Sequence, residues 1–286
     1  MIRALGLRET GLLLRSPLPN EARTRGTING VRLPSSLLTH TLAGHWRTWV
    51  LEERGRLQGL VSVRPRGGPR AWEVVYLYSP EKEGALALLQ EASLRLGQRG
   101  ALRLFVRLPQ ESPLLPAVRL ASFSPFTEER EFAAQHPRAP EALPLRPRAG
   151  GDDHRLFLFY QQIVPGSVAQ AQGVGVEEWR ESQERWSREW VREREGQVCG
   201  WLRLEERGPR GFLSLLAPPQ DLDGALGYGL ARLRGRAWVH CLALAFQGEL
   251  EGSLLELGFQ KVGENTLLVK ELVARVPQPS LAPLHA

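Results

Sequence analysis

Apolar and polar residues alternate along two separate stretches of the chain, GLVSV at 59–63 and GWLRL at 200–204. Successive side chains of a β-strand point to opposite faces, so each alternation predicts a strand with one buried face. Turn-forming residues follow both stretches, RGGPR in the first and RGPR in the second, and another apolar run comes next. Each stretch therefore predicts a β-hairpin that continues into a further strand.

The region of the first hairpin recurs in the second half of the chain. Six of its residues reappear at one constant spacing: Trp49, Val50, Glu52, Gly55, Gly59 and Gly67 correspond to Trp190, Val191, Glu193, Gly196, Gly200 and Gly208. Self-similarity at a fixed spacing indicates a duplicated structural unit.

The elements after the hairpin also follow one order in both halves. A third strand ends in proline, a helix begins at Gly-Ala-Leu, and a strand, a short helix and a closing strand follow. The longer elements are predicted at 71–80, 84–100, 101–108 and 128–134 in the first half, and at 211–219, 224–236, 237–246 and 265–273 in the second. The strand, helix and strand in the middle of each half predict a right-handed, parallel βαβ unit.

This order predicts an α/β protein of two tandem domains, each with a mixed, mostly antiparallel sheet, a βαβ unit and flanking helices. The domains are expected at 1–136 and 137–275, joined by a proline-rich connection at about 133–151. The last residues, 276–286, are predicted to be a disordered tail.

Three tryptophans at spacings of seven and four, Trp179, Trp186 and Trp190, predict a helix over 176–190 with one aromatic stripe. Such a stripe serves either as a stacking surface for aromatic ligands or as packing against the sheet.

Composition narrows the class of protein. The chain has 286 residues, of which 42% are apolar and 24% charged, so it is globular and long enough for two cores. The net charge of +6 comes almost entirely from arginines spread along both halves, which does not indicate a specific nucleic-acid partner. No apolar run has the length of a membrane span or of a secretory signal, so we expect a cytoplasmic protein. Cys199 and Cys241 lie in apolar strands and are expected to be reduced.

This order of elements, with LGF at 257–259 closing the last helix, resembles the GNAT superfamily of acyl-CoA-dependent N-acetyltransferases. The resemblance covers nearly all of both halves. It implies transfer of an acetyl group from acetyl-CoA to an amine, with the pantetheine arm along the fourth strand and the pyrophosphate at the N-terminus of the following helix. A helix N-terminus attracts phosphate through its free N–H groups and its dipole. In the second half, the cofactor positions implied are Leu215, Leu216, Ala217, Gly224, Gly227 and Gly229.

The chain departs from the phosphate loop that the resemblance implies, Arg/Gln-x-x-Gly-x-Gly/Ala. The matching positions are Glu81, Gly84 and Leu86 in the first half, and Asp221, Gly224 and Leu226 in the second. An acid repels a pyrophosphate and a leucine crowds it, so both loops are degenerate. A register shifted by three residues places Gly227 and Gly229 at the glycine positions, which makes the second half the expected cofactor site.

The resemblance also implies a carboxylate base on or near the fourth strand and a tyrosine acid four residues before the GF glycine. Glu73 and Tyr78 on the fourth strand are the candidate catalytic residues, although strand alternation places them on opposite faces. Val118 and Leu254 occupy the tyrosine positions and cannot donate a proton.

Two functions remain open after these comparisons. One is an acetyltransferase with acetyl-CoA as cofactor and a small-molecule amine as acceptor. The other is a non-catalytic protein that has lost CoA binding and holds another ligand or partner. The six histidines show no metal-ligand spacing, so no metal is expected, and neither is a specific nucleic acid or a membrane.

Overall fold

The computed structural model describes residues 1–5, 41 and 43–272. The strands of this part of the chain form one sheet of twelve, in the order β1-β2-β3-β4-β5-β12-β6-β11-β10-β9-β8-β7. Among these strands, only the β4–β5 and β10–β11 pairs are parallel. The protein is therefore a mixed α/β fold with a large, mostly antiparallel sheet. The predicted tail at 276–286 lies outside the described residues.

The strands of the first half are β1 (Ile2–Ala4), β2 (Arg47–Glu53), β3 (Arg56–Pro65), β4 (Ala71–Tyr78), β5 (Arg103–Pro109) and β6 (Ser124–Gln135). Those of the second half are β7 (Arg146–Pro147), β8 (Arg188–Arg194), β9 (Gln197–Arg207), β10 (Arg210–Leu216), β11 (Trp238–Leu244) and β12 (Gln260–Glu271). The described helices are α3 (Lys82–Gly97), α4 (Leu115–Leu120), α5 (Asp153–Ile163), α6 (Gly166–Gln172), α7 (Val176–Ser182), α8 (Pro219–Arg232) and α9 (Gly248–Glu256).

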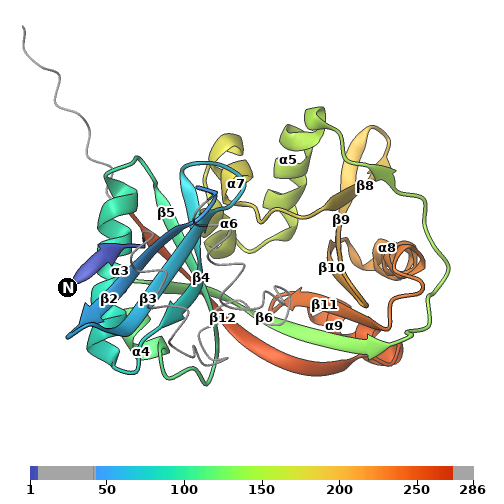
Figure 1. Ribbon diagram of the computed structural model, residues 1–286. Coiled ribbons are helices and arrows are strands. Elements are labelled where there is room, and N and C mark those ends of the chain that lie inside the picture. The colour runs from blue at the N-terminus through green and yellow to red at the C-terminus, as the bar shows by residue number, and fades with distance from the viewer. Residues whose placement is uncertain (6–40, 42, 273–286) are drawn as a thin grey trace, which may run out of the picture.

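The closing strands of the two halves are exchanged. β6, from the first half, pairs with β11, and β12, from the second half, pairs with β5. β6 and β12 also pair with each other and run in opposite directions across the middle of the molecule (Figure 1). The sequence does not predict this exchange. An apolar strand pattern shows which face is buried but not which neighbour the strand pairs with. The division into domains at 136/137 stays a prediction.

The exchange also connects the two hydrophobic cores. The core under α3 and α4 contains Leu268 from β12, and the core under α8 and α9 contains Phe132 from β6. A third cluster lies on the other face of β9, where Trp201 packs under α5, α6 and α7. These three helices lie over the junction of the halves, since α5 contacts β9, α6 contacts β6 and α7 contacts β4 (Figure 1).

The predicted helix at 176–190 is shorter than its tryptophan spacing suggests. α7 ends at Ser182, Trp186 lies in the following loop, and Trp190 belongs to β8. Residues 188–194 therefore form a strand that pairs with β9, even though the tryptophans have helical spacing. Trp179 is fully buried with its ring 5.7 Å from that of Trp201, so it packs against the sheet rather than forming a stacking surface.

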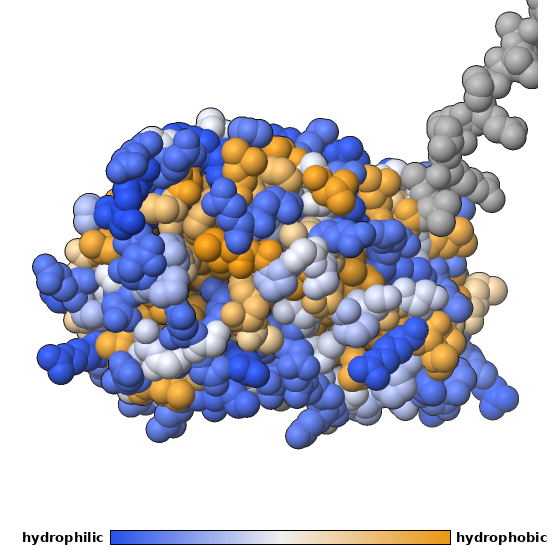
Figure 2. All heavy atoms as spheres, turned by 180° about the vertical axis from the view of Figure 1, so that it is seen from behind, coloured by the Kyte–Doolittle hydropathy of each residue, from blue (hydrophilic) through white to orange (hydrophobic). Residues whose placement is uncertain are grey.

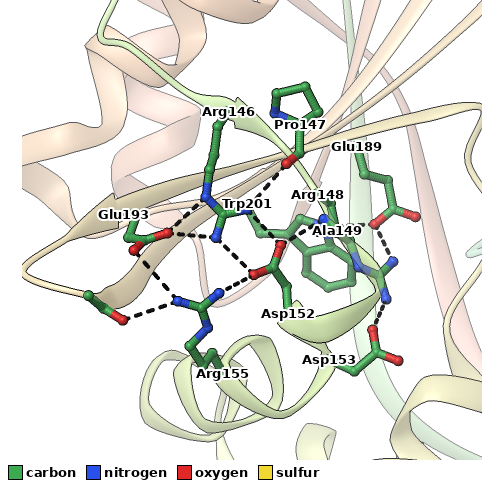
Figure 3. Close-up of polar contacts among 11 residues, drawn as sticks. Arg146, Pro147, Arg148, Ala149, Asp152, Asp153, Arg155, Glu189, Glu193 and Trp201 are labelled. Atoms are coloured by element: carbon green, nitrogen blue, oxygen red, sulfur yellow. Dashed lines mark hydrogen bonds and ion pairs between the residues drawn. The ribbon is translucent and has the colours of Figure 1, made fainter.

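The connection between the halves, residues 136–145, has no helix or strand and lies against α8. Its Leu143 N–H donates to the Gly224 carbonyl at 2.9 Å. Beyond it, the buried carboxylate of Asp152 accepts hydrogen bonds from Arg146 and Arg155, and Arg148 binds Glu189 (Figure 3). These contacts fix the end of the connection between α5 and β8.

Large exposed apolar side chains are scattered over separate elements of the described chain and include Leu120, Leu158, Val174, Trp238 and Val262. On the face shown in Figure 2, apolar and hydrophilic residues are mixed over the surface. No helix within the described residues is long and apolar enough to cross a membrane. Cys199 and Cys241 are both free thiols, as expected.

Candidate functional site

The two parallel strand pairs separate before they end. β4 and β5 pair only from Ala71 with Arg103 to Glu73 with Phe105. β10 and β11 pair from Arg210 with Trp238 to Ser214 with Leu242. The backbone of each pair beyond these positions has no ladder partner across the gap. Both gaps therefore leave backbone groups that another extended molecule or a side chain can bind.

In the second half, the side-chain amide of Gln247 fills this gap. Its Nε2 donates to the Leu215 carbonyl at 2.6 Å, and its Oε1 accepts from the Leu244 N–H at 2.9 Å. An amide thus links the two separated strands as a neighbouring peptide group would. Gln247 lies directly before α9 and was not singled out by the sequence.

An open groove of about 400 Å³ lies on one side of Gln247. Its walls are mostly apolar and include Ile163, Ala217, Leu222, Phe246 and Leu250. The first residues of α8 and of α9 also line it, so two helix N-termini open onto one groove. Their dipoles favour an anion there. Glu249 is the one acid in this wall, and no arginine or lysine of the described chain lines it.

The corresponding groove of the first half has a volume of about 210 Å³ and is negatively charged. It lies at the N-terminus of α3 and contains three carboxylates, those of Glu53, Glu81 and Glu83. No basic residue of the described chain lines it. Three acids in one small groove repel a pyrophosphate more strongly than one helix dipole attracts it.

A polar cavity of about 40 Å³, which Gln247 also lines, lies between the two halves. Its walls come from both halves and include Arg107, Tyr160, Trp186, Arg203 and Ser214. It adjoins a smaller space of about 20 Å³ at the gap between β4 and β5. The two spaces share Arg66, Arg107, Glu184 and Leu267, so the gaps of both halves converge on one central region.

Ion pairs occupy most of this central region. Arg107 Nη2 lies 2.8 Å from Glu129 Oε2 and 2.7 Å from Glu184 Oε1. Burial opposes the positive charge of Arg107, but these two carboxylates outweigh it and raise its pKa. Arg66 Nη2 lies 3.5 Å from Glu184 Oε1, and its guanidinium stacks 4.2 Å over the Phe105 ring.

The candidate catalytic residues lie apart. Glu73 is buried beside the central region, and its carboxylate binds Arg64 Nε at 2.5 Å. Tyr78 packs with the apolar cluster around Trp46 and Val50. Glu73 and Tyr78 lie toward opposite ends of β4 in different surroundings, and an irregularity in the β3–β4 pairing between them interrupts the simple strand alternation that we expected.

The candidate cofactor residues fall into two groups. Leu215, Leu216 and Ala217 lie at the end of β10 beside the groove and the Gln247 bridge. Gly224, Gly227 and Gly229 lie inside α8, which begins at Pro219 and not at Gly224.

Tight packing explains these glycines. A Cβ at Gly224 would lie 2.2 Å from the Leu143 side chain, and one at Gly227 would lie 2.5 Å from the Pro140 carbonyl. The glycines at 224 and 227 thus allow the connection between the halves to pack on α8.

Several residues of the central region escaped sequence analysis because their partners are far away in the chain. Arg203 did leave a signal, since an arginine stands among the apolar residues of a buried strand. His240 shows the same difficulty. Its Nδ1 lies 2.9 Å from Glu131 Oε1 of β6, a residue of the other half, and both residues are buried. No group of His, Cys, Asp and Glu within the described chain has the arrangement of a metal site.

Comparison with known proteins rests on structure alone. No family model and no curated protein matches this sequence. A GCN5-related N-acetyltransferase from Sphaerobacter thermophilus is 14% identical, with a TM-score of 0.56 over 95% of each chain. A putative acetyltransferase from Pyrococcus horikoshii is 10% identical, with a TM-score of 0.56 over 95% of this chain and 89% of its own. The protein has the GNAT fold. A Drosophila protein, 14% identical with a TM-score of 0.55, shares this fold over 96% of the present chain and 99% of its own.

The two halves of this GNAT fold differ in how they suit acyl-CoA. In the second half, the apolar groove suits a pantetheine arm, and the N-termini of α8 and α9 suit its phosphates. Pro219 has no N–H, so the free donors come chiefly from Gly248 and Glu249 at the start of α9. In the first half, the carboxylates of Glu53, Glu81 and Glu83 at the matching position would repel the phosphates of the same group.

Proposed function

We propose that the protein is an acyltransferase that takes an acetyl group from acetyl-CoA in the groove of its second half and passes it to an amine. One observation carries this proposal. The groove formed by the N-termini of α8 and α9 meets the buried polar cavity at Gln247, where β10 and β11 have separated. A donor in the groove and an acceptor in the cavity would therefore meet between the two strands.

The roles of the residues follow from their positions. Ala217, Leu222 and Phe246 would hold the apolar part of the donor, and the start of α9 would hold its phosphates. Acetyl-CoA itself supplies the acetyl thioester. Because Gln247 already binds the Leu215 carbonyl, its side chain would have to turn away before an extended arm could pair with β10. Glu73 and Tyr78 remain predictions, and no proton transfer between them is proposed.

A second candidate, a non-catalytic binding protein, is favoured by the Gln247 bridge itself. The bridge satisfies the backbone groups that a pantetheine arm would need, and no described arginine or lysine lines the groove to bind phosphate. In this case the protein would bind a ligand in the central cavity and would not use acetyl-CoA.

Calorimetric titration of acetyl-CoA separates the two candidates. Gly248→Glu adds a carboxylate to the groove wall, and Gly252→Glu adds the same group on the same helix outside it. A Cβ meets no atom within 4 Å at either position, so both variants should fold. We expect the wild type and Gly252→Glu to bind saturably, and Gly248→Glu to bind at least ~10-fold more weakly, because the added charge repels the phosphates.

Two results would count against the acyltransferase. The wild type could show no heat with millimolar acetyl-CoA, which would leave the binding protein. Alternatively, the two glutamate variants could bind acetyl-CoA equally, which would place any cofactor site outside this groove.

A further inference from the structure

The buried cavity beside Gln247 contains hydrogen-bond donors that have no acceptor in the described protein. Tyr160 is 3% exposed, and its hydroxyl makes no hydrogen bond to any residue that the structure describes. The indole N–H of Trp186 and the Nε–H of Arg107 are buried and equally without an acceptor. All three residues line the same cavity. Because a buried polar group without a partner is costly, such a gathering indicates a site built for a ligand.

Arg203 gives this cavity a positive charge of its own. Its Nη2 donates to Ser214 Oγ at 2.8 Å, and its guanidinium lies 4.5 Å from the centre of the Trp201 ring and 5.3 Å from that of Trp186. It forms no ion pair with any described residue. Burial lowers the pKa of Arg203, even though Glu189 and Glu184 oppose this from a distance.

The nearby carboxylates already have arginine partners. Glu184 and Glu129 bind Arg107, and Glu189 binds Arg148 at 2.7 Å. Arg203 is therefore the arginine of the cavity wall for which the described chain supplies no ion-pair partner. An anion in the cavity would provide that partner, since buried charges in proteins are ordinarily paired.

The volume of the cavity limits the size of the anion that can bind there. About 40 Å³ holds roughly three water-sized groups, which suits a planar carboxylate and not a whole nucleotide. The apolar side chains of Leu216, Leu242 and Leu244 line the same cavity, so the apolar part of a small molecule also finds contacts there.

We propose that this cavity binds the carboxylate of a small organic molecule, held by the guanidinium of Arg203, the hydroxyl of Tyr160 and the indole N–H of Trp186. The site does not depend on CoA binding and serves either candidate function. In the acyltransferase, it makes the acceptor an amine that also carries a carboxylate.

Saturation-transfer NMR with sodium propionate and with propionamide, in the absence of acetyl-CoA, tests the site. The two probes have nearly the same shape, but only propionate carries a charge. We expect saturable binding of propionate by the full chain and at least ~10-fold weaker binding of propionamide, because the amide loses the charge-assisted hydrogen bonds.

Variants locate the binding. Tyr160→Phe removes only a hydroxyl that has no partner among the described residues, so it should keep the unfolding temperature and weaken propionate binding by about 10-fold. Arg203→Gln should abolish saturable binding, whereas Arg207→Gln, on the same strand but outside the cavity, should bind propionate as the wild type does.

Equal binding of the two probes, or no saturable binding of propionate, would show that the cavity holds only water and would overturn the proposal. If Tyr160→Phe bound propionate with wild-type affinity, that result would also contradict the proposed site, even if Arg203→Gln failed to fold. Since no CoA is present, the outcome is separate from that of the acetyl-CoA titration.

Discussion

Asp152 is the most tightly held carboxylate at the end of the connection between the halves. It is completely buried, receives two hydrogen bonds from Arg146 at 2.7 and 2.8 Å, and receives one from Arg155 at 2.6 Å (Figure 3). The Ala149 N–H adds another at 2.7 Å. The hydrogen bonds from Arg146 lower the pKa of Asp152 well below its usual range, although burial opposes the shift.

We therefore expect Asp152→Asn to lower the free energy of unfolding by about 3 kcal/mol at pH 7, because it leaves two arginines without their buried partner. A lowered pKa stabilises the fold above the unfolded-state value of about 3.9, and that stabilisation is lost as the pH falls through the folded-state pKa. The difference between wild type and variant should thus shrink below about pH 4. Urea unfolding at a series of pH values measures it.

Asp223→Asn provides the control, since Asp223 is exposed and should change the free energy of unfolding by no more than about 0.5 kcal/mol. A constant difference between wild type and Asp152→Asn from pH 7 to pH 2 would contradict the role given to the carboxylate charge.

The connection packs so closely on α8 that the helix positions facing it have room only for glycine. Glycine inside a helix ordinarily weakens it, so its retention at two positions needs a reason. Gly227 supplies one, because a methyl group there would meet the backbone carbonyls of Pro140 and Glu141 at 2.5 and 2.8 Å. The glycines lower the intrinsic stability of the helix, but they allow residues 136–145 to lie close to it.

Gly227→Ala should therefore destabilise the protein by about 1–3 kcal/mol in urea unfolding, since the added methyl overpacks against backbone that cannot rotate away. Gly252→Ala, on α9 with open space around its Cβ, should instead stabilise it by about 0.5–1 kcal/mol. If both substitutions stabilise the protein, the connection is not packed on α8 as described.

The exchange of β6 and β12 makes the stability of each half depend on the other. Leu268 is fully buried, lies on a strand of the second half and packs into the core of the first. The sheet has no break between β5 and β11 where the halves could part without exposing strand edges. The two halves should consequently unfold together.

Leu268→Ala should lower the free energy of unfolding by about 2–5 kcal/mol, the usual cost of removing a buried leucine side chain. Amide hydrogen exchange should show the same loss of protection in β3 of the first half and β9 of the second. Leu255→Ala, at an exposed position on α9, should leave both strands unchanged. Unaltered protection of β9 in Leu268→Ala would mean that the halves unfold independently.

Part of the candidate site could be predicted from the sequence, and part could not. The end of β10 was expected beside a cofactor because of the resemblance to the GNAT superfamily, and the structure places it beside the groove at the start of α8 and α9. Gly227 and Gly229 were expected in a phosphate loop because of the same resemblance, and in the structure Gly227 packs against the connection and Gly229 against Leu202 of β9. Gln247 could not be predicted, since its role depends on two strands that separate only in the folded sheet.

The sequence by itself determined the order of most strands and helices in both repeats, the mostly antiparallel α/β class and the resemblance to the GNAT fold, because these depend on the spacing of apolar residues, glycines and prolines within short segments. Only the tertiary structure decided that the closing strands are exchanged and that Arg203, Tyr160 and Trp186 surround one cavity. Strand partners and charge neighbours are chosen by contacts between residues far apart in the chain, and no local pattern records those contacts.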